Sequence, residues 1–213
     1  MQYGICPLSI VPLRAEPKNA SEQTSQLLYG EFFSILNHQK SWSKIQNTSD
    51  GYEGWVNNKH FKFIEKSIFQ KLQATNKRYS TELVDFIWKD DNILFPTPIG
   101  SLVSSAQILG HRYEGKELIE TEPKGNLVNT ALKYLNSPYM WGGKSPFGID
   151  CSGLVQCAYQ LHGVQLPRDA YQQAEYGETL GFIDESEPGD LAFFDNPEGK
   201  ITHVGIIMPD YHI

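Results

Sequence analysis

Two patterns of apolar and polar positions follow one another along the chain, and they change near residue 120. From residue 3 to about residue 65, short stretches alternate between apolar and polar positions, and turn-forming residues such as Asp50-Gly51 separate them. Alternation with a period of two predicts β-strands that bury one face. Several short strands at close spacing are typical of a small barrel, so residues 1–65 are predicted to form a small all-β barrel domain. The alternating stretches are SIVPLRAEP, GEFFSILNH and SWSKIQNT.

The middle segment, residues 66–120, has a weaker pattern. Its stretches YSTELVDFIW and NILFPTPIG are compatible with further strands. We expect this segment to be either a β-rich linker or a degenerate second barrel.

The pattern becomes helical from about residue 124. The stretch NLVNTALKYLNS predicts a helix that ends before Pro138, and CSGLVQCAYQLHG predicts a second helix that ends at Gly163. The stretches LAFFD and THVGIIM are typical of buried strands, so residues 121–213 are predicted to form an α+β domain. The expected core-facing positions are Leu127, Val128, Ala131, Leu132 and Leu135 in the first helix, and Leu154, Val155, Ala158, Tyr159 and Leu161 in the second.

The charge of the chain narrows the classes of partner. Its formal net charge is -7, from 18 basic and 25 acidic residues, without a block of Lys or Arg. Such a chain is a poor candidate for binding nucleic acid or an anionic membrane. No apolar run approaches the roughly 20 residues that a membrane helix needs. The N-terminus MQYGICPLSIVPLRAEP lacks the features of a secretory signal, so we expect a cytoplasmic protein unless the N-terminus was trimmed.

The three cysteines are Cys6, Cys151 and Cys157. An odd and sparse set argues against a disulfide framework. Because there is no Cys-x-x-Cys pair and no His at zinc-ligand spacing, we expect neither a metal nor a cofactor. Cys6 and Cys157 lie among apolar residues, and each is interpreted as a small buried hydrophobic residue.

Cys151 has a different setting. A Gly-rich loop leads to Asp150-Cys151-Ser152-Gly153, and the second predicted helix follows at once. At a helix N-terminus, free backbone N–H groups and the helix dipole favour an anion, which lowers a thiol pKa into the range of ~3.5–7.5 and offers an oxyanion hole. Such a nucleophile needs a base, and His203, at the start of a predicted strand, is the best-placed histidine. Spacing alone leaves this pairing open.

The order of the motifs suggests a family. The segments PYMWGG, DCSGLVQCAY, LPRDAYQQA, PGDLAFF and THVGI together resemble the NlpC-type family of bacterial cell-wall cysteine peptidases, whose domain is papain-like. The segments IVPLRAEP, QLLYGEFFSIL and GYEGWV resemble the bacterial Src-homology-3-like barrel that often precedes such peptidases. Together they resemble the γ-D-glutamyl-L-diamino-acid endopeptidases of cell-wall recycling or turnover. The resemblance implies a murein peptide with a free N-terminal L-Ala as the substrate.

The resemblance also implies roles for individual residues. It makes Cys151 the nucleophile and His203 the general base. Asp150 and Ser152 match residues that contact the γ-D-glutamyl part of the substrate, Tyr139 matches a tyrosine that faces the cleft, and Tyr52 matches a barrel tyrosine that closes the site over the substrate's N-terminus.

Several of these residues have a purely structural alternative. Asp150 is equally suited to be the helix N-cap, Ser152 to be a first-turn residue, and Tyr52 to pack the barrel edge. Trp141 is interpreted as a core aromatic residue, and Arg168-Asp169 either as a surface ion pair or as part of the cleft wall.

Two departures from the family pattern remain. Close relatives carry an acidic residue just before the barrel tyrosine to receive the substrate ammonium, whereas this chain has Gly51 there. The nearby Asp50 and Glu53 are the candidate substitutes. The third catalytic residue would fall at position 215, beyond Ile213, so either the predicted domain is incomplete at the C-terminus or His212 takes the role.

Two other functions compete with the endopeptidase. One is a catalytically inert protein that binds peptidoglycan peptides, and the other is an amidase or acyltransferase on the same fold. The sequence indicates neither diaminopimelate nor lysine as the diamino acid, and it gives no oligomeric state.

Overall fold

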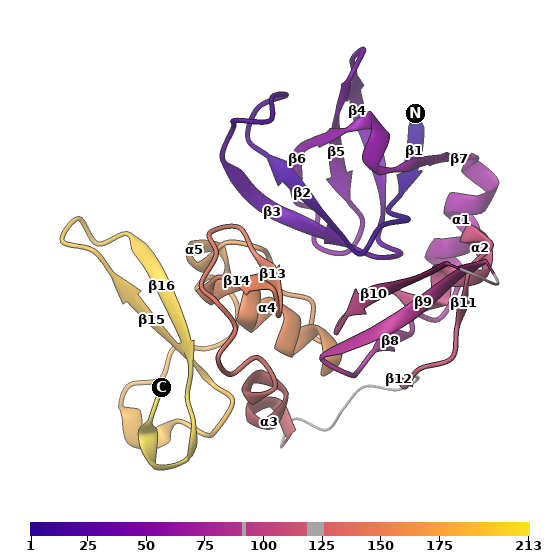
Figure 1. Cartoon of the computed structure of the whole chain (residues 1–213). Helices are drawn as coiled ribbons and strands as arrows, with labels where there is room; N and C mark the ends of the chain where they lie inside the picture. Colours follow the sequence, from indigo (N-terminus) through magenta and orange to yellow (C-terminus); the bar gives the residue numbers. More distant parts are fainter. Residues whose placement is uncertain (91–92, 119–125) are drawn as a thin grey trace.

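The N-terminal part of the chain is a curved antiparallel sheet that closes around its own core. The computed structural model describes residues 1–90, 93–118 and 126–213 (Figure 1). The sheet has seven strands in the order β3-β2-β6-β5-β4-β1-β7. Their bounds are β1 (Gln2–Ile5), β2 (Ile10–Arg14), β3 (Gln23–Leu28), β4 (Phe32–His38), β5 (Trp42–Asn47), β6 (Glu53–Asn57) and β7 (Lys62–Ile64). This is the predicted small all-β barrel.

Alternation along the strands explains the barrel. In β2, Val11 and Leu13 point inward and are 1% exposed, whereas Ile10, Pro12 and Arg14 are only partly buried. The inward residues of several strands form one apolar cluster, which includes Phe33, Ile45 and Val56. Cys6 belongs to the same cluster and is 0% exposed, as expected for a small buried hydrophobic residue.

The middle segment combines a helix with short strands. It contains α1 (Lys66–Ala74), β8 (Tyr79–Ser80), β9 (Val84–Asp90), β10 (Ile93–Pro98), α2 (Ala106–Leu109), β11 (Arg112–Tyr113) and β12 (Glu117–Leu118). Strands β10-β9-β11 form one antiparallel sheet, and β12-β8 form another. Both stretches that were compatible with strands contain them. Residues 119 and 120 of this predicted unit lie outside the described residues.

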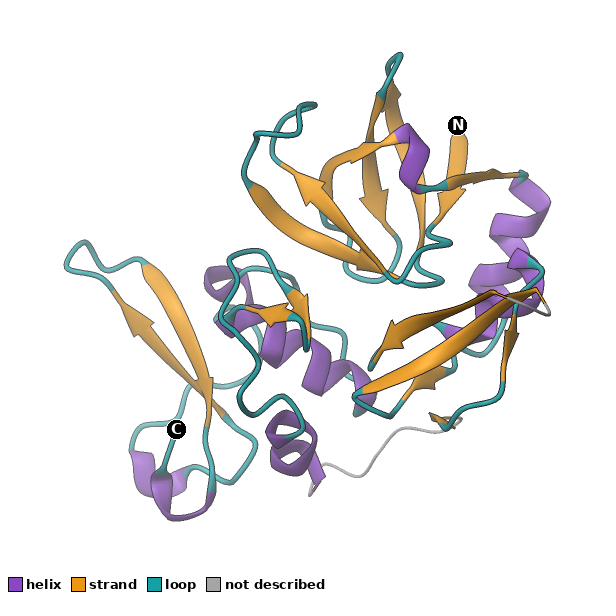
Figure 2. Ribbon diagram, viewed as in Figure 1, coloured by secondary structure: helices purple, strands orange, loops and turns teal. Residues whose placement is uncertain are grey.

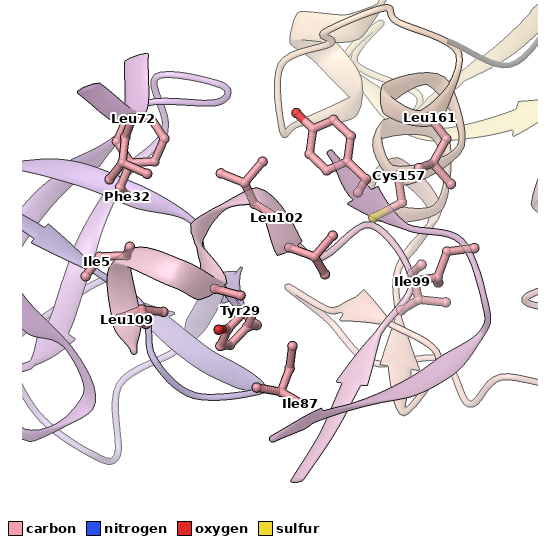
Figure 3. Packing of buried hydrophobic residues seen from close by; sticks show 14 of the residues in the cluster. Ile5, Tyr29, Phe32, Leu72, Ile87, Ile99, Leu102, Leu109, Cys157 and Leu161 are labelled. Atoms are coloured by element: carbon pink, nitrogen blue, oxygen red, sulfur yellow. The ribbon is translucent and has the colours of Figure 1, made fainter. Parts of the chain in front are cut away.

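One apolar core joins the three parts of the chain. Ile5 and Tyr29 of the barrel, Ile87 and Leu102 of the middle segment, and Leu161 of the C-terminal part belong to a single cluster (Figure 3). Gly30 allows close packing there, because its φ is +80° and a Cβ at this position would lie 2.1 Å from the Leu102 carbonyl oxygen. Each part therefore covers apolar surface of the others.

The C-terminal part has the predicted α+β composition. It contains α3 (Leu127–Leu132), β13 (Lys144–Ser145), β14 (Gly148–Ile149), α4 (Cys151–Leu161), α5 (Ala170–Gln173), β15 (Leu191–Asp195) and β16 (Ile201–Ile206). Short 3₁₀ turns occupy Asn58–His60, Val103–Ser105, Ile183–Glu185 and Pro209–Tyr211. Figure 2 shows the helix α4 in this part and the strands of the barrel. Within the described ranges, no helix is long and apolar enough to cross a membrane.

The first predicted helix is shorter than its pattern suggested. Leu127 is 1% exposed, but Leu132 and Leu135, which were expected to face the core, are 45% and 69% exposed. From Lys133 onward, the backbone N–H groups bond three residues back, which tightens the turn and rotates the buried face. Tyr134, 4% exposed, enters the core in their place.

The two C-terminal strands form a hairpin that is buried on one side. Val204 and Ile206 of β16 pack with Val155 and Ala158 of α4. The other face of the hairpin is open, and Phe194 of β15 is 43% exposed there. The strands were expected to be buried, but within the described residues they form a two-stranded sheet that α4 and α5 cover on one face only.

Candidate active site

Cys151 is the first residue of α4, where the predicted nucleophile was expected. Asp150 is the N-cap, with an extended backbone, and its Oδ1 accepts from the Gly153 N–H at 2.7 Å. Gly163, with φ +79°, follows the C-cap residue His162 and ends the helix as predicted. Cys151 is partly buried and has a free thiol. The thiol therefore lies at the end of an eleven-residue helix where backbone N–H groups can receive an oxyanion.

Asp150 belongs to a buried network rather than to the cleft surface. The carboxylate is 7% exposed and receives two guanidinium nitrogens of Arg168, Nη2 at 2.8 Å on Oδ2 and Nη1 at 3.0 Å on Oδ1. The Gly142 N–H donates to Oδ2 at 2.8 Å. Of the two interpretations of Arg168-Asp169, the surface ion pair is wrong, because Arg168 is 2% exposed and pairs with Asp150, while a role in the cleft wall stays a prediction. Its buried charge needs a carboxylate, and the N-cap supplies one.

Ser152 joins the same network. Its side chain is 6% exposed, and its Oγ accepts from Arg168 Nη1 at 2.9 Å and donates to Asp150 Oδ1 at 3.4 Å. Gln173 also fixes the start of α4, because its Nε2 donates to the Ser152 carbonyl at 3.1 Å. Asp150 and Ser152 are therefore fixed beside Cys151, and their contact with a substrate stays a prediction.

Tyr139 lies beside the thiol and is accessible. Its side chain is 66% exposed. Partial burial, and then the neighbouring Cys151 and Asp150, raises the pKa of its hydroxyl. The neighbouring Trp141 was interpreted as a core aromatic residue, but it is 62% exposed. Its indole N–H donates to Glu22 Oε1 of the barrel at 2.6 Å, which holds the ring at the surface.

Tyr52 brings the barrel to the same region. It is half-buried in the loop before β6. Burial, and then the charge of Asp169 in the C-terminal part, raises the pKa of its hydroxyl. The structure thus places Tyr52 near Asp169, which the sequence indicated, together with Arg168, as a surface ion pair or a part of the cleft wall. Burial also raises the pKa of the Asp169 carboxyl.

The acidic residues around Gly51 are already engaged. Asp50 Oδ1 accepts from the Tyr52 N–H at 3.0 Å, and Oδ2 accepts from Gln156 Nε2 of α4 at 3.0 Å. Glu53 forms an exposed ion pair with Lys44 at 2.6 Å. Gly51 itself has φ +71° and no heavy atom within 4 Å of a built Cβ. Both suggested substitutes for the missing acid therefore have other partners.

The predicted base, His203, is in β16 and is exposed. Its neighbour Val204 faces α4, so alternation turns His203 toward the other face of the hairpin, where its ring lies 5.7 Å from that of Phe194. Pairing becomes irregular between Phe194 and Asp195, directly beside His203, and such irregularities bend a strand. Across the described ranges, no hydrogen bond joins the imidazole to the Cys151 thiol. The catalytic pair stays a prediction.

His212, the proposed alternative orienting residue, follows the turn Pro209–Tyr211. Its carbonyl accepts from the Met208 N–H at 2.7 Å, so the chain folds back before its last residue. The side chain of Ile213 then lies against Gly205, on the His203 face of the strand. The identity of the third catalytic residue stays open. In the described part of the chain, no group of three or more His, Cys, Asp or Glu residues is arranged to hold a metal ion.

Comparison with known families matches both ends of the chain. Residues 136–212 match the NlpC/P60 family, and residues 13–61 match a bacterial dipeptidyl-peptidase Sh3 domain. Both matches fall within the predicted terminal units, while the limits of those units stay predictions.

Curated relatives cover most of the chain. The chain is 32% identical over 216 residues to dipeptidyl-peptidase 6 of Lysinibacillus sphaericus, which covers 85% of this chain and 78% of the relative. It is 26% identical over 224 residues to a γ-D-glutamyl-L-lysine dipeptidyl-peptidase of Bacillus cereus, which covers 90% of this chain and 66% of the relative. The chain therefore spans about two thirds to three quarters of the length of these proteins.

Solved structures share the fold. An NlpC/P60 family protein from Bacillus cereus ATCC 10987 superimposes with a TM-score of 0.80 at 19% identity, over 98% of this chain and 88% of that one. An NlpC/P60 endopeptidase from Photobacterium damselae subsp. piscicida gives a TM-score of 0.69 at 18% identity, over 97% of this chain and 57% of that one. At these identities the likeness concerns the fold.

Proposed function

We propose that this chain, which belongs to the NlpC/P60 family and is a cysteine peptidase, hydrolyses the γ-D-glutamyl-L-diamino-acid bond of murein-derived peptides with a free N-terminal L-Ala. The reaction would serve cell-wall recycling or turnover. One observation carries the proposal: Asp50 accepts from the Tyr52 N–H of the barrel and from Gln156 of α4, so the Tyr52 loop is attached to the helix that begins with Cys151. The curated relatives named for such dipeptidyl-peptidase activity support it.

The chemistry proposed for the site is acyl transfer to sulfur. The Cys151 thiolate attacks the γ-carbonyl carbon of D-Glu, and N–H groups at the start of α4 stabilise the oxyanion. Collapse of this intermediate breaks the C–N bond, and the His203 imidazolium gives its proton to the departing amine of the diamino acid. Water, with His203 as its base, then cleaves the thioester and releases L-Ala-D-Glu.

Recognition of the free amine is assigned to Asp169 together with Tyr52. Asp50 bonds Gln156 and Glu53 pairs with exposed Lys44, while Asp169, which also caps α5, is the acidic residue whose charge acts on the Tyr52 hydroxyl. A cationic partner would further offset the cost of partly burying the Asp169 charge. A substrate with a blocked amine would leave both groups unpaired and would be rejected strongly.

The test compares the tripeptide L-Ala-γ-D-Glu-L-diamino acid and its N-acetylated form as substrates. Each is made once with lysine and once with diaminopimelate as the diamino acid. We expect mass spectrometry to detect L-Ala-D-Glu from the free tripeptides only. In Tyr52→Ala, cleavage of the free tripeptide should fall toward that of the acetylated one. Trp42→Ala, at a partly buried position at the start of β5, is the control variant in the barrel and should keep the selectivity. Equal cleavage of free and acetylated peptides would contradict the proposal.

A further inference from the structure

Strand β3 of the barrel packs tightly against Gly142–Lys144, in the loop that leads to Cys151. Strand β3 packs against Gly142–Lys144 so closely that a Cβ on Gly142 would lie 2.4 Å from the Gln23 carbonyl oxygen. The Lys144 N–H donates to Gln26 Oε1 of β3 at 2.8 Å. Any shift of β3 therefore shifts this loop.

The same loop fixes the start of α4. The Gly142 N–H donates to Asp150 Oδ2 at 2.8 Å, and the Gly143 carbonyl accepts from Arg168 Nη2 at 3.2 Å. Asp150 precedes Cys151 and caps its helix. The position of the thiol, and the backbone N–H groups around it, thus depend on where the loop lies.

Arg168 makes a second and direct connection to the barrel. Its Nη atoms are occupied by Asp150, Ser152 and Gly143, while its Nε donates to Ser25 Oγ of β3 at 3.2 Å. Ser25 is 1% exposed, so this hydroxyl is sheltered from water. The guanidinium is held between the barrel on one side and the N-cap of α4 on the other.

A buried ion pair makes a third connection. Lys144 and Glu31 are 1% and 4% exposed, and Nζ lies 3.4 Å from Oε1. Burial disfavours the ammonium, but Glu31 and then Asp50 raise the pKa of Lys144 above its usual value. The Leu28 N–H donates to Glu31 Oε2 at 2.7 Å, which orients the carboxylate. Because an unpaired buried charge is costly, this pair ties the loop to the barrel.

We infer that Ser25 and Glu31 of the barrel are positioning residues for the Cys151 nucleophile, acting through Arg168 and Lys144. The barrel then affects the reactivity of the Cys151 thiol, in addition to any contact with the substrate. The inference rests on Cys151 as the proposed nucleophile and on no particular substrate, so a small alkylating reagent is enough to test it.

The experiment measures the rate at which iodoacetamide alkylates Cys151 as a function of pH, in Ser25→Ala, Ser25→Thr and Ser43→Ala. Ser43 is the matched control, because it is 0% exposed and its Oγ donates to Asn58 Oδ1 at 2.7 Å inside the barrel. For Ser25→Ala we expect a rate at neutral pH about 3- to 10-fold lower and a profile moved to higher pH, since one pKa unit is tenfold in thiolate below the midpoint. Ser25→Thr keeps the hydroxyl and should restore both. Ser43→Ala should match the unmodified protein.

The ion pair is tested with Glu31→Gln, Lys144→Met and the double variant. In Glu31→Gln, the buried Lys144 ammonium loses its carboxylate partner, so both the thermal stability and the rate of Cys151 alkylation should fall. The double variant should regain thermal stability. Its Cys151 should still be alkylated several-fold more slowly than in the unmodified protein, because the Lys144–Glu31 pair no longer joins the loop to the barrel. The inference is overturned if Ser25→Ala and the double variant alkylate like the unmodified protein, or if Ser43→Ala slows alkylation equally. Absence of muropeptide cleavage with these alkylation results intact would instead refute the proposed function.

Discussion

Burial separates the three cysteines at the scale of the residue. Cys6 and Cys157 are 0% exposed, and burial raises the pKa of Cys6 to about 12 and that of Cys157 above its usual value. Cys151 is only partly buried. Because the thiolate is the reactive form, iodoacetamide at neutral pH should label Cys151 first. Peptide mass spectrometry measures the order, with Cys151→Ser as the control. Labelling of Cys157 before Cys151 would refute the nucleophile assignment.

The exposure of His203 predicts a loss of activity without a loss of folding. His203→Ala should reduce turnover of the free tripeptide by about three or more powers of ten, as for other members of a nucleophile–base unit. Stability should change little, because the imidazole is at the surface. His162→Ala is the matched control, since that ring bonds Thr130 Oγ1 at 3.0 Å at the far end of α4. Near-normal turnover in His203→Ala would assign the base to another histidine.

Asp169 predicts a pH dependence of substrate capture. Burial raises the pKa of this carboxyl, so it becomes protonated at a higher pH than an ordinary aspartate. Only the ionised form pairs with the substrate ammonium, so kcat/KM for the free tripeptide should fall as the pH drops through the raised pKa. In Asp169→Asn, kcat/KM should be low and should lack this contribution. Steady-state kinetics from pH ~4 to ~8 measure both profiles. An unchanged acid limb in the variant would exclude Asp169 from amine recognition.

At the scale of the element, α4 depends on a charge outside its own sequence segment. Asp150 caps the helix, and Arg168 is buried against it. Replacing the carboxylate leaves the guanidinium uncompensated, so Asp150→Asn should lower the free energy of unfolding by about 3–5 kcal/mol. Glu53→Gln removes an exposed ion pair and should cost less than about 1 kcal/mol. Urea denaturation gives both values, and equal costs would show that the buried pair is not important for stability.

At the scale of the whole molecule, the parts should unfold together. The shared core contains Ile5 of the barrel, Leu102 of the middle segment and Leu161 of α4, so loss of one part exposes apolar surface on the others. The four tryptophans report on all three parts, at Trp42, Trp55, Trp88 and Trp141. Tryptophan fluorescence and far-ultraviolet circular dichroism should therefore give coincident urea transitions with one midpoint. A separate early transition by either probe would show that the barrel is an independent unit.

Local interactions explain what could be predicted from the sequence. Asp150 and Gly153 interact within one helical turn, so the motif alone specifies the cap and the start of α4 at Cys151. Strand alternation likewise determines which residues of β2 enter the barrel core. Both depend on neighbours a few positions apart, where backbone geometry leaves few choices.

Tertiary packing decided the remainder. The partner of Asp150, the surface position of Trp141, and the approach of Asp169 to Tyr52 all join segments that are distant in sequence. Periodicity describes which face of an element is apolar, but it carries no information on which distant element covers that face or neutralises a buried charge. The sequence by itself determined that a β-barrel comes first along the chain and that Cys151 lies at the start of a helix after it. Tertiary packing determined that Arg168 neutralises Asp150 beside that cysteine and that Ser25 and Glu31 of the barrel bond Arg168 and Lys144, because a buried ion must find its partner in space.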